Sequence, residues 1–228
     1  MKHSISLMTL IVFVASMPIL LGCAQKVPSS SEDEGGLDKP SLATEVQPVS
    51  LRDDTPEAVF ASMREATEDR DYYTFAAYWT DSSQDKIAVG LVQHYLLMLE
   101  QRQQGIRTNA NAMGEIVESY EIDVDSVAAI LNAAGMTQDE LIAEAGKLIH
   151  DKPAFIGDAM MLINQDSSED EYIQGEIDSI VIEGERAVGW CVLPEDGGEM
   201  KIEFINTPEG WRIELPEGES VEEVDEPE

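Results

Sequence analysis

Basic side chains are scarce in this sequence. Its 228 residues contain 14 Lys and Arg against 46 Asp and Glu, which gives a formal net charge of −32 at pH 7. A surface that binds nucleic acid needs clustered Lys and Arg to neutralise phosphates, and electrostatic docking on anionic lipid has the same requirement. The composition therefore argues against a nucleic-acid partner and against a membrane contact made by charge.

Recognisable catalytic and cofactor motifs are also absent. The sequence has no Gly-x-Ser-x-Gly elbow, no His-Glu-x-x-His pair, no Cys-x-x-Cys pair and no phosphate-binding loop. It predicts neither a cofactor nor a metal centre. An active site assembled from scattered residues would leave no such motif, so an enzyme stays open as an alternative.

The first part of the chain has the pattern of an export signal. Lys2 and the terminal amine supply positive charge, residues 4–22 are uncharged with an apolar centre at residues 10–15, and Gly22 stands before Cys23. A charged start, an apolar middle and a small residue before the cut are typical of a secretory signal peptide. The pattern predicts a signal peptide over residues 1–22 that is cleaved between Gly22 and Cys23.

The residues Leu20-Leu21-Gly22-Cys23 resemble a bacterial lipoprotein lipobox, although Leu21 stands where a small residue is usual. The resemblance implies that Cys23 becomes the acylated first residue of the mature chain. Several acyl chains on one residue would hold the protein on a membrane stably, whereas a single chain holds weakly. The resemblance places the protein in the bacterial cell envelope, on the periplasmic or extracellular face. The alternative is an uncleaved transmembrane helix.

If Cys23 carries lipid, Cys191 is left alone and no disulfide can form within the chain. Removing residues 1–22 would remove one lysine and no acid, so the mature chain would carry −33 rather than −32. Folding must then depend on a hydrophobic core.

Two polar segments flank the predicted domain. Residues 23–50 are a lipidated N-terminus followed by a linker rich in Pro, Ser and Gly, which would reach about 30 Å as a flexible coil. Residues 216–228 hold seven acids and no base, a composition typical of a solvated tail. The single folded domain is therefore expected over 51–215, long enough to bury about 70% of its unfolded surface.

Helical spacing of apolar residues predicts helices between 55 and 165. Start signals are Thr55 followed by Pro56, Asp71, and Thr137 with Glu140 in a capping box. Gly105 and Gly135 are expected to end helices, and Pro153 to begin the last one.

Over residues 171–215 the spacing of apolar residues changes from the helical period to a period of two, which is typical of strands. Strands are predicted over about 172–182, 186–193, 199–206 and 211–215, with Trp211, Ile213 and Leu215 on a buried face and Arg212 and Glu214 on a wet one. The fold class is α+β: N-terminal helices packed on a C-terminal four-stranded antiparallel meander.

Two stretches resemble the nuclear-transport-factor-2-like superfamily. Residues 55–60 leading into 70–75 are similar to its opening helical hairpin, and residues 183–188 with 204–213 are similar to its closing strands. The resemblance implies a cone-like fold, a curved sheet around helices with a cavity at its mouth. Residues 106–165 would be an enlarged helical insertion. The superfamily includes isomerases, dehydratases and non-catalytic binders, so the fold alone does not identify a function.

Few residues are candidates for chemistry. His94, beside Tyr95 on an apolar stripe, is a weak candidate for an acid–base, and a half-buried structural histidine explains it as well. Tyr72, Trp79 and Tyr95 are candidate pocket residues, although aromatic residues at such spacing also build cores. Cys191 is expected to be a small buried residue.

Acidic clusters offer two further candidates. Asp123-Val124-Asp125 fails as an EF-hand loop, since Ala128 and Ala134 stand where Gly and Glu are needed, and helix capping explains it. For the cluster of Asp166, Glu169, Asp170 and Glu171, a solvated loop is expected, with weak binding of a divalent ion as the alternative.

Two classes of function follow. The preferred one is a non-catalytic envelope lipoprotein that binds a small molecule or a protein. The alternative is a small cone-fold hydrolase or isomerase that uses His94, and a weaker idea is binding of divalent ions by the acidic tail.

Overall fold

The structure is a computed structural model that describes residues 54–165, 177–192 and 199–215. The predicted signal peptide, the cleavage and lipidation positions Gly22 and Cys23, the linker and the tail 216–228 lie outside the described residues. So do the acidic cluster at 166–171 and the first residues of the first predicted strand.

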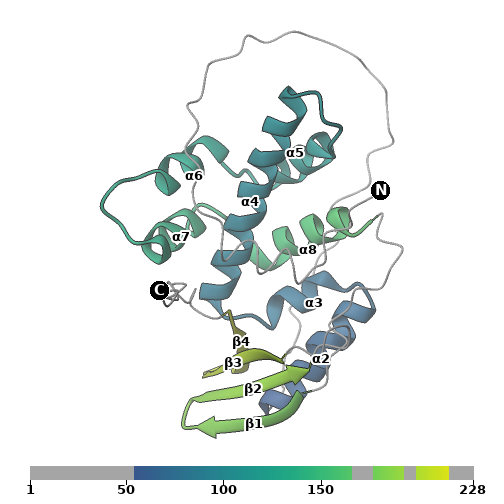
Figure 1. Ribbon diagram of the computed structural model, residues 1–228, viewed down its shortest axis with the longest axis vertical. Coiled ribbons are helices and arrows are strands. Elements are labelled where there is room, and N and C mark those ends of the chain that lie inside the picture. The colour runs from purple at the N-terminus through teal and green to yellow at the C-terminus, as the bar shows by residue number, and fades with distance from the viewer. Residues whose placement is uncertain (1–53, 166–176, 193–198, 216–228) are drawn as a thin grey trace, which may run out of the picture.

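The predicted α+β class and the order of its elements are confirmed (Figure 1). Over the described ranges, seven helices precede a four-stranded antiparallel sheet with the strand order β1-β2-β3-β4. The helices are α2 (Pro56–Glu68), α3 (Tyr72–Ala77), α4 (Asp81–Gln103), α5 (Ala110–Ser119), α6 (Val124–Leu131), α7 (Gln138–Gly146) and α8 (Lys152–Ile163). The strands are β1 (Ile177–Glu183), β2 (Arg186–Val192), β3 (Glu199–Thr207) and β4 (Gly210–Glu214).

Three predicted helix starts are confirmed by their caps. The side chains of Thr55 and Asp71 accept hydrogen bonds from the backbone N–H groups of Ala58 and Thr74, which begins α2 and α3. Thr137 and Glu140 form both bonds of the capping box that begins α7. Asp123 caps α6 through Ser126, in agreement with its expected structural role, and these hydrogen bonds lower its pKa.

One predicted helix end is wrong. Helix α6 ends at Leu131 and not near Gly135: the side-chain amide of Asn132 donates to the carbonyl of Ala128, and the next backbone N–H, that of Ala133, donates to Ile130 three residues back and not four. Gly135, with φ of +90°, lies instead in the loop that joins α6 to α7.

Tight turns fix the register of the sheet. Gly184 has φ of +66° at the first position of the two-residue turn between β1 and β2, where a type II′ turn requires glycine. The turn between β3 and β4 pairs Thr207 with Gly210, whose φ is +110°. Phe204 is thereby aligned with Ala187 on one side and Ile213 on the other, and all three are buried.

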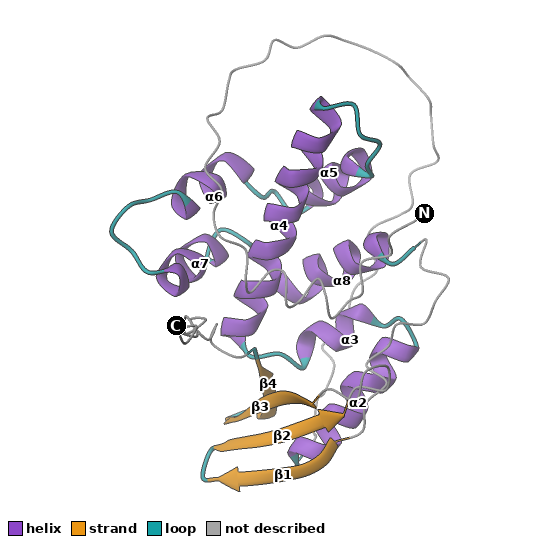
Figure 2. Cartoon of the chain, viewed as in Figure 1, coloured by secondary structure: helices purple, strands orange, loops and turns teal. Residues whose placement is uncertain are grey.

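The core lies between the sheet and the helices (Figure 2). Helix α2 contacts β1 and β4, while α4 contacts β4 at its start and α5, α6, α7 and α8 along its length. This central position explains why α4 departs from the expected single apolar stripe: Ala88, Val89 and Val92 are buried as well as Ile87 and Leu91.

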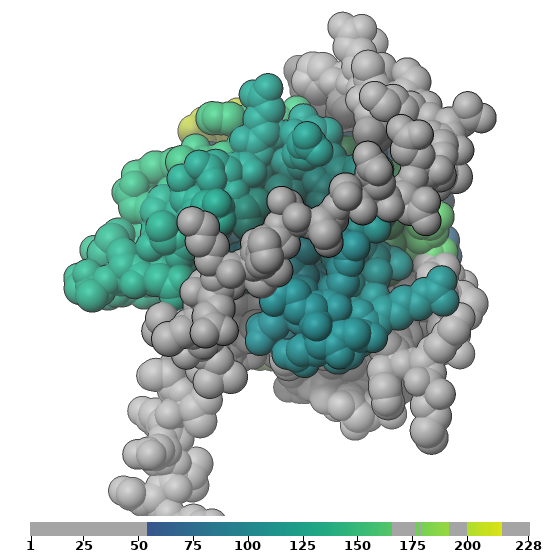
Figure 3. Space-filling view, turned by 90° about the horizontal axis from the view of Figure 1, so that it is seen from above, coloured from purple at the N-terminus to yellow at the C-terminus, as the bar shows by residue number. Residues whose placement is uncertain are grey.

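The sheet and α2 form one end of the molecule and α5 lies toward the other (Figure 1). Seen from above, α5 and the neighbouring part of α4 face the viewer, and α6 and α7 extend to one side (Figure 3). Among the described residues, no helix combines the length and apolar composition needed to span a membrane.

Candidate functional site

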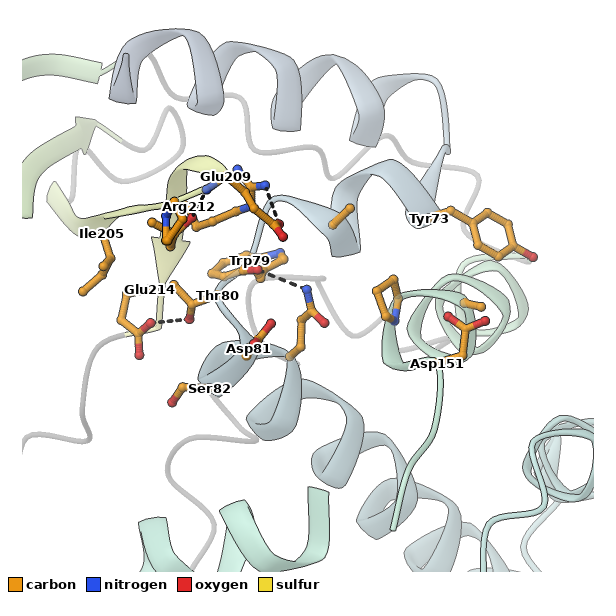
Figure 4. Close-up of a pocket in the computed structure, with 16 residues that line it drawn as sticks. Tyr73, Trp79, Thr80, Asp81, Ser82, Asp151, Ile205, Glu209, Arg212 and Glu214 are labelled. Carbon is orange, nitrogen blue, oxygen red and sulfur yellow. Dashed lines mark hydrogen bonds and ion pairs between the residues drawn. The ribbon is translucent and has the colours of Figure 1, made fainter. Parts of the chain in front are cut away.

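A groove opens where the sheet meets the helices, with a volume of about 790 Å³. Three segments form it: the junction of α3 and α4 with Trp79 and Thr80, the start of α8, and the hairpin of β3 and β4 with Arg212 and Glu214. Figure 4 shows Glu214, Thr80 and Arg212 on one side and Asp151 and Tyr73 on the other. The remaining lining residues are Ala77, Asp81, Ser82, Gln84, Pro153, Ala154, Ile205, Thr207, Pro208 and Glu209.

Backbone hydrogen bonds hold β4 against the junction of α3 and α4. The N–H of Thr80 donates to the carbonyl of Ile213 at 2.9 Å, and the N–H of Ile213 donates to the carbonyl of Tyr78 at 2.9 Å. The N–H of Leu215 donates to the hydroxyl of the fully buried Ser83 at 2.8 Å. The last strand and the first turn of α4 therefore form one continuous wall.

Side chains reinforce this wall. The Thr80 hydroxyl caps α4 by accepting from the N–H of Ser83 at 3.2 Å, and it donates to the carboxylate of Glu214. The side-chain amide of Gln84 donates to the carbonyls of Ala76 and Trp79, at 3.2 and 3.1 Å, and so supplies hydrogen-bond donors to carbonyl groups at and just after the end of α3.

Arg212 is the only basic residue among the described lining residues and is only 8% exposed. Its Nη1 donates to the carbonyl of Trp211 at 2.8 Å, and its Nη2 lies 3.5 Å from the carboxylate of the exposed Glu209. The expectation that Arg212 lies on a solvent-exposed face is wrong: Arg212 is buried beside the junction of α3 and α4, whose backbone pairs with the edge of β4.

Asp151 enters the groove with an unusual backbone. It precedes α8 with φ of +48° and ψ of 56°, the left-handed region, which Asp tolerates better than most residues. Its side chain makes no capping hydrogen bond, so its exposed carboxylate is left beside the groove.

Trp79 contributes a buried aromatic wall. It is 6% exposed and packs edge-on against Phe75, with ring centroids 5.7 Å apart. Its indole N–H has no hydrogen-bond partner within the described residues. A buried N–H without an acceptor is uncommon in folded proteins, which makes this position notable.

Behind the groove, two tyrosines share one carboxylate. The hydroxyl of Tyr73 points away from the groove (Figure 4) and donates to Asp158, and Tyr120 donates to the other oxygen of Asp158 at 2.7 Å. Burial, followed by the hydrogen bond to Asp158 and its charge, raises the pKa of both phenols. The cluster joins α3, the end of α5 and α8, and it keeps both phenols protonated at neutral pH.

The candidates from the sequence are not brought together. Trp79 lines the groove, whereas Tyr72 is buried in α3 with 4% exposure. His94 and Tyr95 are half-buried on α4 away from the groove, and a Cβ built on Gly114 of α5 would lie 2.9 Å from the Tyr95 hydroxyl. Burial lowers the pKa of His94, which favours its neutral form.

Cys191 has a structural explanation. Cys191 is fully buried, as expected, and burial raises the pKa of its thiol. Within the described ranges, no group of three or more His, Cys, Asp or Glu residues is arranged to hold a metal ion.

Sequence reasoning missed Thr80, Asp151 and Arg212. The alternation along β4 placed Arg212 and Glu214 on one face, and Thr80-Asp81 has the form of a helix start. Only the tertiary contact between β4 and the junction of α3 and α4 shows that these signals belong to one groove.

Comparisons of the chain with models of protein families, with curated proteins and with solved structures gave no match.

Proposed function

We propose that the protein is a lipid-anchored, extracytoplasmic binding protein that holds its ligand in the groove without catalysing a reaction. The observation that carries the proposal is the groove itself, because about 790 Å³ lies within the range of ligand sites in proteins. The signal pattern and Cys23 support the expected location in the cell envelope. The nuclear-transport-factor-2-like resemblance stays a prediction.

The composition of the groove favours binding over catalysis. Among the described lining residues there is no His, Cys or Lys, so the hydroxyls of Thr80 and Ser82 have no imidazole or amine in that lining to act as a general base. His94 is on another part of α4, and it makes no hydrogen bond or ion pair with any described carboxylate. Trp79, Phe204 and Trp211 belong to the buried core between the sheet and the helices, and the groove lies at the edge of that core beside Trp79.

The binding proposal can be tested by amide chemical shifts of the mature chain with Cys23→Ser, labelled with ¹⁵N. Small cationic, anionic and neutral fragments would be added in turn. We expect at least one class to shift the amides of Thr80, Ser82 and Arg212, while amides of α6 and α7 stay in place. If no class shifts the groove amides, a binding function for the groove is wrong.

The anchor is tested separately. Cys23→Ser removes the thiol that would accept the lipid, so we expect the variant to incorporate no radiolabelled palmitate in a bacterial host while the wild-type chain does. Cys191→Ser is the matched control and should be labelled as the wild type is. Palmitate in the Cys23→Ser variant would contradict lipidation at this residue.

A further inference from the structure

Negative charge is in excess along the groove. Of the described residues, Asp81, Asp151, Glu209 and Glu214 line it together with one guanidinium, that of Arg212. Glu214 accepts a hydrogen bond from a neutral hydroxyl, and Glu209 is the only one of the four in an ion pair with Arg212. Asp81 and Asp151 have no ion-pair partner within the described residues, and both are exposed.

The neighbouring lysine does not correct the excess. Lys152 follows Asp151 directly, but its Nζ lies 3.0 Å from the carboxylate of Asp85, below the groove on α4. The side chains of Lys152 and Asp85 are 24% and 19% exposed, so this pair is partly withdrawn from water. Lys152 therefore pairs with Asp85 and does not neutralise Asp151, whose carboxylate can pair with a cation of a ligand.

A second, independent observation is the donor on Trp79. Its side chain lines the groove with 6% exposure, and its indole N–H lacks an acceptor within the described residues. A buried donor without a partner has lost its hydrogen bonds to water without replacement, which is an energetic cost to the fold. A ligand that brings a carbonyl oxygen to the edge of the indole would remove this cost.

We propose that the groove binds an extended lysine- or arginine-containing segment of a partner protein. This rests on the proposed binding function and names its ligand class. The ammonium or guanidinium groups of the segment pair with Asp81 and Asp151, and one of its backbone carbonyls accepts from Trp79. A volume of about 790 Å³ suits a short segment and not a folded domain. The −33 charge of the mature chain attracts such a partner from a distance.

The test is calorimetry on the mature chain with Cys23→Ser in 150 mM NaCl. The probe is acetyl-Lys-Ala-Arg-Ala-Lys-amide, and the comparisons are acetyl-Glu-Ala-Glu-Ala-Glu-amide and spermidine. We expect the basic peptide to bind and the acidic peptide not to bind. Asp81→Asn with Asp151→Asn should weaken the basic peptide at least tenfold. The control pair Glu115→Gln with Glu118→Gln, exposed on α5, changes the net charge equally and should alter the affinity less than twofold.

Several results would overturn the inference. Equal weakening by both pairs of substitutions would mean that the peptide responds to overall charge and not to the groove. Spermidine binding as tightly as the peptide would mean that the site takes amines and does not read a peptide backbone. If the basic peptide fails to bind while anionic or neutral fragments shift the groove amides, the ligand class is wrong and the binding function stands. If nothing shifts those amides, both are wrong.

Discussion

Asp158 is the residue on which α3, α5 and α8 converge, because it accepts from Tyr73 and Tyr120. We expect Tyr120→Phe to lower the free energy of unfolding by about 1–3 kcal/mol, since it removes a hydrogen bond to a charged group. Tyr95→Phe is the matched control and should cost under about 0.5 kcal/mol, because its hydroxyl makes no hydrogen bond within the described residues. Urea denaturation measures both, and equal effects would mean that the Tyr120 hydroxyl contributes nothing specific.

His94 should make the fold sensitive to mild acid. Burial lowers its pKa in the folded protein, so below about pH 6.5 the unfolded chain binds a proton that the folded chain resists. The contribution of His94 is therefore present above this pH and is lost as the pH falls toward its folded pKa. We expect His94→Gln to flatten the decline in melting temperature between pH 7 and pH 5, compared with the exposed control His150→Gln. A parallel decline in both variants would contradict this.

At the scale of elements, α3 and α8 approach each other through a glycine. A Cβ on Gly157 would lie 2.6 Å from the ring of Tyr73, which cannot move away freely because its hydroxyl is bound to Asp158. We expect Gly157→Ala to lower the free energy of unfolding by about 1–3 kcal/mol. Gly114→Ala is the control, since its new methyl would meet only the far end of Tyr95 and would gain helix propensity. Gly157→Ala being as stable as the wild type would show that the two helices separate easily.

The elements were predictable where local chemistry decides them. Thr55, Asp71 and Thr137 start helices through contacts within three residues, and the turns at Gly184 and Gly210 need glycine for their backbone angles. The end of α6 was missed because Asn132 stops the helix before the stronger glycine signal is reached. The groove was missed for a different reason: Thr80 and Glu214 are 134 residues apart, and no local pattern states that they meet.

At the scale of the whole molecule, the proposal is an acidic domain held by lipid at Cys23 and separated from the membrane by a linker of about 30 Å. This arrangement would let the groove meet segments of other envelope proteins. The charge of the chain would speed the encounter with a basic partner, and added salt would slow it.

The most direct test of the account fills the groove. Ala77 lies in its lining and is half-buried, so Ala77→Trp would occupy the space with an indole. The basic peptide would be titrated into the ¹⁵N-labelled wild-type chain and into this variant, and amide chemical shifts would be followed once unperturbed α6 and α7 amides confirm that the variant folds. We predict that the peptide shifts the amides of Thr80, Ser82 and Arg212 in the wild-type chain and leaves them in place in Ala77→Trp. Shifts of the same size in both proteins would contradict the claim that the groove is the binding site.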